Sequence, residues 1–147
     1  MLKPTKAPIS AAMARVVNVA STGQAAIDFD DVMLERGYHG LDAYCRSKLA
    51  MIMSAFELAD HQVTVNALHP AHLMDTRAVR EYGLTPQVGT DAGARPTIRL
   101  ITDPDLETVT GRYFDRFPDT QAHEQAYDNA ARSRLAALTS ELTVDHG

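Results

Sequence analysis

The chain has 147 residues, of which 45% are hydrophobic and 22% charged, and these proportions favour one globular domain and exclude a disordered chain. Its formal net charge is −5 and its fourteen basic residues are scattered, so the composition gives no basic patch for nucleic acid or for an anionic membrane surface. Cys45 is the single cysteine, which excludes an internal disulfide, and no apolar run reaches the length of about 18 residues that a spanning helix needs, so we expect a soluble, cytoplasmic protein.

A strand, a loop and a long helix are expected in the first part of the chain. Residues 15–20 (RVVNVA) contain three valines and predict a buried strand, which the turn-forming residues 21–23 end. Residues 24–41 are polar and acidic with two glycines, and predict mostly loop. Asp42 is the predicted N-cap of a helix over residues 43–60, a segment rich in Ala, Leu, Met and Glu and free of Gly and Pro.

A second strand is predicted over residues 63–68 (VTVNAL), an apolar and β-branched run that His69 and Pro70 end. A strand, a helix and a second strand in this order form a unit whose two strands lie parallel, because the helix provides the crossover between them. The fold class predicted from this order is α/β, with a parallel sheet covered by helices.

The remaining elements are less regular in sequence. Residues 71–89 predict a long irregular stretch, and a helix is expected from residue 90 or 91 to about residue 102. Pro96 falls inside that helix and predicts a kink or a late start, because proline removes a backbone donor. Residues 108–114 (TVTGRYF) predict a third strand, and leucines at helical spacing in residues 122–142 predict an amphipathic terminal helix.

Three side chains have the spacing and position for acid–base chemistry. Tyr44 and Lys48 are four residues apart in the predicted long helix, so the phenol and the ammonium lie on one face, and a nearby cation stabilises a phenolate. Ser21 follows a predicted parallel strand, at the edge where open α/β sheets bind ligands. The alternative interpretation is a surface Tyr–Lys pair and a serine that only ends a strand.

Several segments together resemble the short-chain dehydrogenase/reductase family. The resemblance rests on NVAS at the end of a strand, on YCRSK at residues 44–48 and on VTVNALHP at the end of the next strand. It continues through IDFDD at residues 27–31, TDPDLETVTGRYFD at residues 102–115 and the terminal helix. The interval between Ser21 and Tyr44 is longer than is usual in the family, as in its retinol-dehydrogenase-like branch.

The resemblance implies a role for each of the three side chains. In the family the tyrosine gives or takes the proton at the substrate oxygen, which assigns this role to Tyr44. The lysine stabilises the tyrosine phenolate and binds the nicotinamide ribose, and the serine hydrogen-bonds the substrate carbonyl, which assigns these roles to Lys48 and Ser21. The implied activity is NAD(P)-dependent interconversion of an alcohol and a carbonyl compound.

The implied cofactor is NAD or NADP, and the resemblance assigns further contacts to it. Besides Tyr44 and Lys48, the family uses a Pro-Gly pair and a later threonine after the second strand; here these positions are Pro70, Ala71 and Thr76. Ala71 stands where the family has glycine, and its methyl group is expected to crowd the nicotinamide modestly.

No metal site is expected. His69, His72 and Asp75 lie close together in sequence, but the two histidines flank a proline at the exit from a strand, and this spacing does not place two imidazoles on one face. The structural interpretation, which we favour, is that these residues belong to a strand end and a loop.

The Gly-rich turn that holds a dinucleotide pyrophosphate does not occur in the sequence. We therefore interpret residues 1–147 as a single, partial catalytic domain with a Rossmann-like doubly wound parallel sheet of about three strands and flanking helices. By this interpretation the N-terminal strands and a complete dinucleotide-binding half are missing. Three hypotheses follow: a fragment of an oxidoreductase, a truncated non-catalytic homologue that serves as a dimerisation or binding module, and one half of a split enzyme. The isolated chain is expected to be inactive.

Two kinds of partner are expected. Residues 71–89 are moderately apolar and favour a small alcohol or carbonyl compound as substrate, once the enzyme is complete. The helix Ala43–Ala59 carries apolar residues on several faces, and the strand over residues 15–20 would present an uncovered edge, so we expect a homo-oligomer formed through that helix. No nucleic acid or membrane partner is expected.

Overall fold

The computed structural model describes residues 14–59 and 63–144, in which a three-stranded parallel sheet lies between helices. The strands are β1 (Arg15–Val19), β2 (Thr64–His69) and β3 (Tyr113–Asp115), and their order in the sheet is β1-β2-β3. Both neighbouring pairs are parallel. The predicted α/β class is confirmed.

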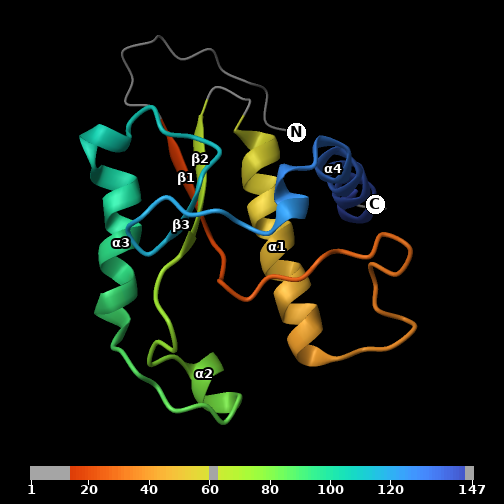
Figure 1. The fold of residues 1–147 in the computed structure, drawn as a ribbon, viewed down its shortest axis with the longest axis horizontal. Coiled ribbons are helices and arrows are strands. Elements are labelled where there is room, and N and C mark those ends of the chain that lie inside the picture. Colours follow the sequence, from red (N-terminus) through yellow and green to blue (C-terminus); the bar gives the residue numbers. More distant parts are fainter. Residues whose placement is uncertain (1–13, 60–62, 145–147) are drawn as a thin grey trace.

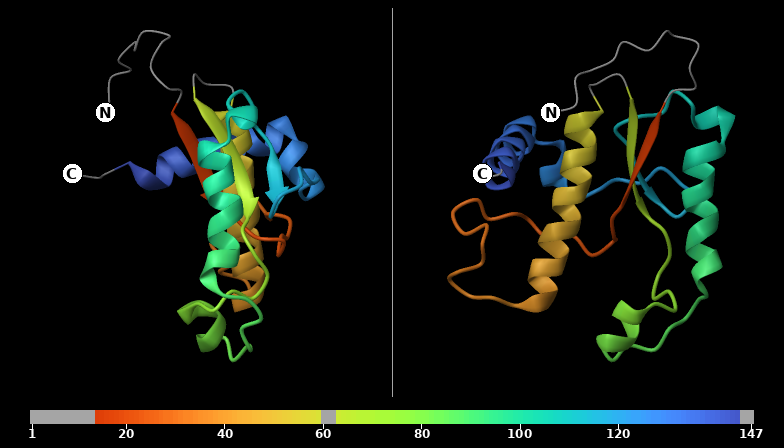
Figure 2. Two further views of the ribbon diagram at one scale, coloured as in Figure 1. Left: turned by 90° about the vertical axis from the view of Figure 1, so that its left-hand side faces the viewer. Right: turned by 180° about the vertical axis from the view of Figure 1, so that it is seen from behind.

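Helices cover both faces of this sheet. Helix α1 (Gly40–Leu58) lies on one face and α3 (Thr90–Thr102) on the other, and α4 (Asn129–Thr143) packs on the outer side of α1 (Figure 1). The same order of layers is seen from behind (Figure 2). Shorter helical segments are α2 (Arg77–Glu81), η1 (Pro104–Leu106) and η2 (Glu124–Tyr127). This arrangement is the predicted doubly wound sheet, with three strands in the described residues.

Strand β1 is less buried than its sequence predicts. Val16 and Val19 are 40% and 44% exposed, whereas every residue of β2 is buried. The difference follows from position, because β2 has a neighbour on each side and β1 lies at the edge of the described sheet. The prediction of a buried strand over residues 15–20 is therefore wrong for Val16 and Val19.

The larger core lies between α1, the sheet and the C-terminal helices. Five residues of α1 are buried in it: Leu49, Ile52, Met53, Ala55 and Phe56. Val65 and Ala67 of β2 face this core, whereas Leu68 faces a smaller core under α3, as expected from the alternation of side chains along a strand. Each large side chain buried here stabilises the fold by about 1.5–3 kcal/mol.

The boundaries of three elements differ from the sequence prediction. Helix α1 begins at Gly40, and Asp42 lies in its first turn and pairs with Arg46 (Nε to Oδ2, 2.8 Å) instead of capping the helix. Helix α3 starts at Thr90 and is helical through Pro96, so the late start is wrong; Pro96 is fully buried, and this packing offsets part of the missing hydrogen bond. Strand β3 is only three residues long because Gly111, at φ +67°, turns the chain just before it.

Two further segments contain more structure than the sequence indicates. The stretch over residues 71–89, predicted to be irregular, contains the short helix α2. The hydrogen bond from Asp75 N to Val88 O (2.8 Å) joins the two chain segments that flank this helix. The terminal helix is interrupted, because Asp128 ends η2 and caps α4 by accepting hydrogen bonds from Ala130 N and Ala131 N.

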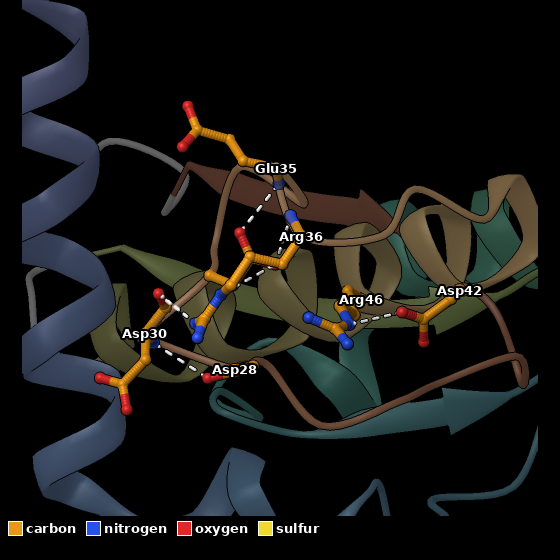
Figure 3. A network of polar contacts seen from close by, with 7 residues as sticks. Asp28, Asp30, Glu35, Arg36, Asp42 and Arg46 are labelled. Atoms are coloured by element: carbon orange, nitrogen blue, oxygen red, sulfur yellow. Dashed lines mark hydrogen bonds and ion pairs between the residues drawn. The ribbon is translucent and has the colours of Figure 1, made fainter.

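The loop over residues 24–39 contains no helix or strand, as predicted, and polar contacts hold it in place. The Asp31 carboxylate accepts hydrogen bonds from the backbone N–H groups of Glu35 (2.8 Å) and Arg36 (3.1 Å), and the Arg36 guanidinium donates to the Asp30 carbonyl at 2.6 Å (Figure 3). These bonds give the chain that joins β1 to α1 a defined path.

Candidate active site

Ser21 lies just beyond the carboxyl end of β1. The hydrogen bond from Ala20 N to Leu68 O (2.7 Å) extends the pairing of β1 with β2 by one residue, so Ser21 is the first residue beyond the carboxyl end of the paired strands. Its side chain is buried. The carboxyl ends of the strands, the N-terminal turns of α1 and helix α2 all lie at the same end of the molecule, the lower end in Figure 1.

Tyr44 and Lys48 lie on one face of α1 and are close in space, as their spacing predicts. The Lys48 ammonium lies 5.5 Å from the centroid of the Tyr44 ring. It also donates a hydrogen bond to the Val19 carbonyl (3.2 Å), the last residue of β1. Tyr44 is 41% exposed. The pair is therefore fixed against the strand that leads to Ser21.

Ser21 and Tyr44 converge at Gly23. A Cβ atom placed on Gly23 would lie 3.5 Å from both Ser21 Oγ and Tyr44 Cε1, and 3.3 Å from Cys45 Sγ. The three side chains therefore surround one point, which the missing side chain of Gly23 leaves open. The sequence alone did not identify Gly23 as part of the site, because its close neighbours Tyr44 and Cys45 are brought beside it by the fold.

The Ser21 hydroxyl is oriented by its own turn. Ser21 Oγ accepts a hydrogen bond from Gly23 N at 3.0 Å. This bond uses the oxygen as an acceptor and leaves the hydroxyl proton to be donated to another group.

The predicted cofactor contacts lie beyond the carboxyl end of β2. Pro70 and Ala71 are both buried and follow the last residue of β2 directly. Thr76 lies farther along, at the N-cap of α2, where its hydroxyl accepts a hydrogen bond from Val79 N (3.4 Å). The structure thus brings Pro70 and Ala71 to the strand edge next to β1, and assigns Thr76 a capping role.

An apolar hollow adjoins this edge. A cavity of about 320 Å³ is lined by residues at the ends of β1 and β2 and on α3, among them Val19, Pro70 and Ile98. On α3, Gly93 permits the close packing behind it, because a Cβ there would collide with the Met74 sulfur and lie 3.2 Å from Pro70 Cβ.

His69 ends β2 and is buried. Burial lowers the pKa of His69 below its ordinary value, and the nearby Asp115 carboxylate opposes the shift. Within residues 14–59 and 63–144, no group of three or more His, Cys, Asp or Glu side chains has the geometry of a metal site. In the same part of the chain, no helix has the length and apolar composition that crossing a membrane requires.

Comparisons with known proteins connect this fold with oxidoreductases. The chain is 30% identical over 155 residues to human retinol dehydrogenase 13, which covers 90% of this chain and 46% of that protein. It is 33% identical over 146 residues to human retinol dehydrogenase 12, covering 89% and 46%. It is 31% identical over 154 residues to a probable oxidoreductase from Streptomyces antibioticus, covering 89% and 52%. No model of a protein family matches the chain.

A solved structure agrees with this relationship at the level of the fold. The crystal structure of an uncharacterised protein from Mycobacterium paratuberculosis superposes with a TM-score of 0.68 and 21% sequence identity, over 88% of this chain and 50% of that one. The structure and this likeness define the class, a Rossmann-like α/β protein. The likeness to the retinol dehydrogenases and to this fold supports a C-terminal fragment of a short-chain dehydrogenase/reductase. It spans about half the length of the curated relatives it matches.

Proposed function

We propose that Ser21, Tyr44 and Lys48 form the catalytic set of an NAD(P)-dependent oxidoreductase that interconverts an alcohol and a carbonyl compound. The observation that carries the proposal is the convergence of Ser21 Oγ and the Tyr44 ring at Gly23, with the Lys48 ammonium 5.5 Å from that ring. The names of the relatives, retinol dehydrogenases and oxidoreductases, support the same chemistry. The apolar cavity beside Val19 and Pro70 favours a moderately apolar small molecule as substrate.

Each side chain has a distinct task in this proposal. The Ser21 hydroxyl, whose oxygen already accepts a bond from Gly23 N, donates its proton in a hydrogen bond to the substrate oxygen. The exposed Tyr44 phenol gives a proton to that oxygen in carbonyl reduction and its phenolate takes one in alcohol oxidation. The Lys48 ammonium stabilises the phenolate by its positive charge.

The donor groups at this edge fit a nicotinamide cofactor, which accepts or donates the hydride when bound. Lys48 donates to the Val19 carbonyl (3.2 Å) and to the Met51 sulfur (3.8 Å), and an ammonium has three N–H groups, so one remains for a ribose hydroxyl. Tyr44, Pro70, Ala71 and Thr76 would complete the contact. Because Ala71 is buried by its own chain, little of its methyl group faces the accessible edge, which favours room for the nicotinamide.

We propose further that residues 1–147 act as one partial catalytic domain with little cofactor affinity of its own. None of the three described strands is followed by a Gly-rich turn that opens a helix, the feature that holds a pyrophosphate. Isothermal titration calorimetry of this chain with NADH and NADPH is expected to give no dissociation constant tighter than millimolar, together with negligible turnover. A micromolar dissociation constant for either cofactor would contradict this part of the proposal.

A second candidate function, a non-catalytic dimerisation or binding module, is favoured by exposed apolar residues at the edge of the sheet. Val16 and Val19 of β1 and Ile98 and Ile101 of α3 are exposed, and β1 has an uncovered edge in the described sheet. Helix Ala43–Ala59 exposes less apolar surface to a partner, because most of its large apolar residues are buried against its own chain (Leu49, Ile52, Met53 and Phe56). If a homo-oligomer forms, the uncovered edge of β1 and the exposed side of α3 therefore contribute more apolar surface than the sequence suggests.

Self-association is the expected result of these exposed surfaces. Covering four large apolar side chains contributes roughly 1.5–3 kcal/mol each, which favours association even after its entropic cost. Light scattering at about micromolar concentration is expected to show a dimer or a larger species. A monodisperse species of 16.1 kDa that unfolds cooperatively would show that the chain needs no partner on this face.

A further inference from the structure

The backbone of Ser21 is held from the opposite edge of the sheet. Tyr113, the first residue of β3, donates a hydrogen bond from its phenol to the Ser21 carbonyl at 3.1 Å. The Gln24 side-chain amide donates to the same carbonyl at 3.0 Å. One carbonyl oxygen, with two lone pairs, thus receives two side-chain donors, and both lone pairs are used.

The position of Tyr113 follows from the strand register. It pairs with Ala67 of β2, and both side chains face the core under α1. The ring fills space among the core residues, and Tyr113 is only 2% exposed, while its hydroxyl reaches the residue beyond the end of β1. A phenylalanine would fill the same space, so the hydroxyl group has a task besides packing.

The surroundings of Tyr113 keep its phenol protonated, so that it can act as a hydrogen-bond donor. Burial raises the pKa of Tyr113 to about 12, and the Asp115 carboxylate adds to the rise, whereas a hydrogen bond with Gln24 opposes it. The phenol therefore stays protonated at physiological pH and keeps its hydrogen for the Ser21 carbonyl. In this respect Tyr113 differs from the exposed Tyr44, to which the proposed function assigns the proton transfer.

Gln24 is fixed in turn by the C-terminal part of the chain. Its side-chain oxygen accepts a hydrogen bond from His123 N at 2.8 Å. Close by, the Gln125 side chain accepts from Ile27 N (2.7 Å) and donates to Ile27 O (3.0 Å). The segment before and within η2 thus holds the loop after Ser21 at several backbone groups.

We infer that Tyr113 is a positioning residue, which together with Gln24 fixes the Ser21 backbone so that the serine hydroxyl faces the space between Gly23 and Tyr44. The inference rests on the proposed function for the importance of that orientation. The direction of a side chain follows from its backbone, so holding the Ser21 carbonyl holds the Cα–Cβ bond as well. The bond from Gly23 N to Ser21 Oγ then selects the rotamer.

The test compares Tyr113→Phe with Tyr127→Phe in this chain. Both changes remove one phenol hydroxyl that has one backbone partner. The phenol oxygen of Tyr127 accepts a hydrogen bond from Ala122 N at 2.9 Å, whereas the Tyr113 phenol donates to the Ser21 carbonyl. The reporter is the Gly23 amide in a ¹⁵N–¹H spectrum, because this amide donates to Ser21 Oγ. Tyr113→Phe is expected to shift the Gly23 signal and speed its hydrogen exchange roughly tenfold.

Tyr127→Phe is expected to leave the Gly23 signal in place. A crystal structure of Tyr113→Phe gives a second readout, the Gly23 N to Ser21 Oγ distance, which should lengthen beyond about 3.5 Å. An unchanged Gly23 amide and an unchanged distance would overturn the inference, as would equal shifts in both variants. The readout requires no turnover, so a shifted Gly23 amide in a chain whose completed form is inactive would support the positioning while refuting the proposed function.

Discussion

Tyr44→Phe is expected to lower oxidoreductase turnover by about 10²- to 10⁴-fold in a chain that has been completed with a dinucleotide-binding half, fused or added as a separate chain. The change removes only the transferable proton and keeps the ring beside Ser21 and Gly23. The rate is followed as NADH or NADPH formation with a panel of apolar alcohols. Substrate affinity should change little, because the loss concerns the transition state.

Tyr38→Phe is the matched control for Tyr44→Phe. Tyr38 is exposed in the loop just before α1, and the proposal gives it no part in the chemistry. Its substitution is expected to leave the rate unchanged. Turnover by Tyr44→Phe at the level of Tyr38→Phe would contradict the assignment of Tyr44.

Leu49→Ala is expected to lower the free energy of unfolding by about 2–5 kcal/mol, out of a total of about 5–15 kcal/mol for a typical domain. Leu49 is 0% exposed on α1 and follows Lys48 directly. Its removal leaves a cavity between the helix and the sheet, and the helix that carries Tyr44 and Lys48 loses part of its support. Chemical denaturation monitored by circular dichroism measures the change.

Leu58→Ala makes the same chemical change on the same helix at a residue that is 47% exposed. It is expected to alter the free energy of unfolding by less than about 0.5 kcal/mol. Equal effects at both leucines would show that the inward face of α1 does not carry the core as described.

The fold class could be predicted because its main elements have strong local signals. The valines of β1, the composition of α1 and the β-branched run of β2 each specify an element without help from distant residues. The exposure of β1 depends instead on its place in the sheet, and the short length of β3 depends on the turn at Gly111. Helix α2 is five residues long, too short for a periodic pattern to show.

In the candidate site, too, some features could be predicted from local sequence and others could not. The proximity of Tyr44 and Lys48 follows from a spacing of four residues in a helix, so the sequence predicted it. The bond from Tyr113 to Ser21 joins residues 92 positions apart and depends on the register of β3 with β2, which no local pattern reveals. Gly23 is informative only once the helix that brings Tyr44 and Cys45 beside it is in place.

Cofactor affinity in two variants of the completed chain tests the catalytic assignment most directly, because it does not require a known substrate. Calorimetry with NADH and NADPH is expected to give nearly the wild-type dissociation constant for Tyr44→Phe. Lys48→Ala should weaken binding by roughly 10- to 100-fold, since it removes a charge-assisted hydrogen bond to the ribose. Equal losses of cofactor affinity in the two variants would contradict the division of roles between Tyr44 and Lys48.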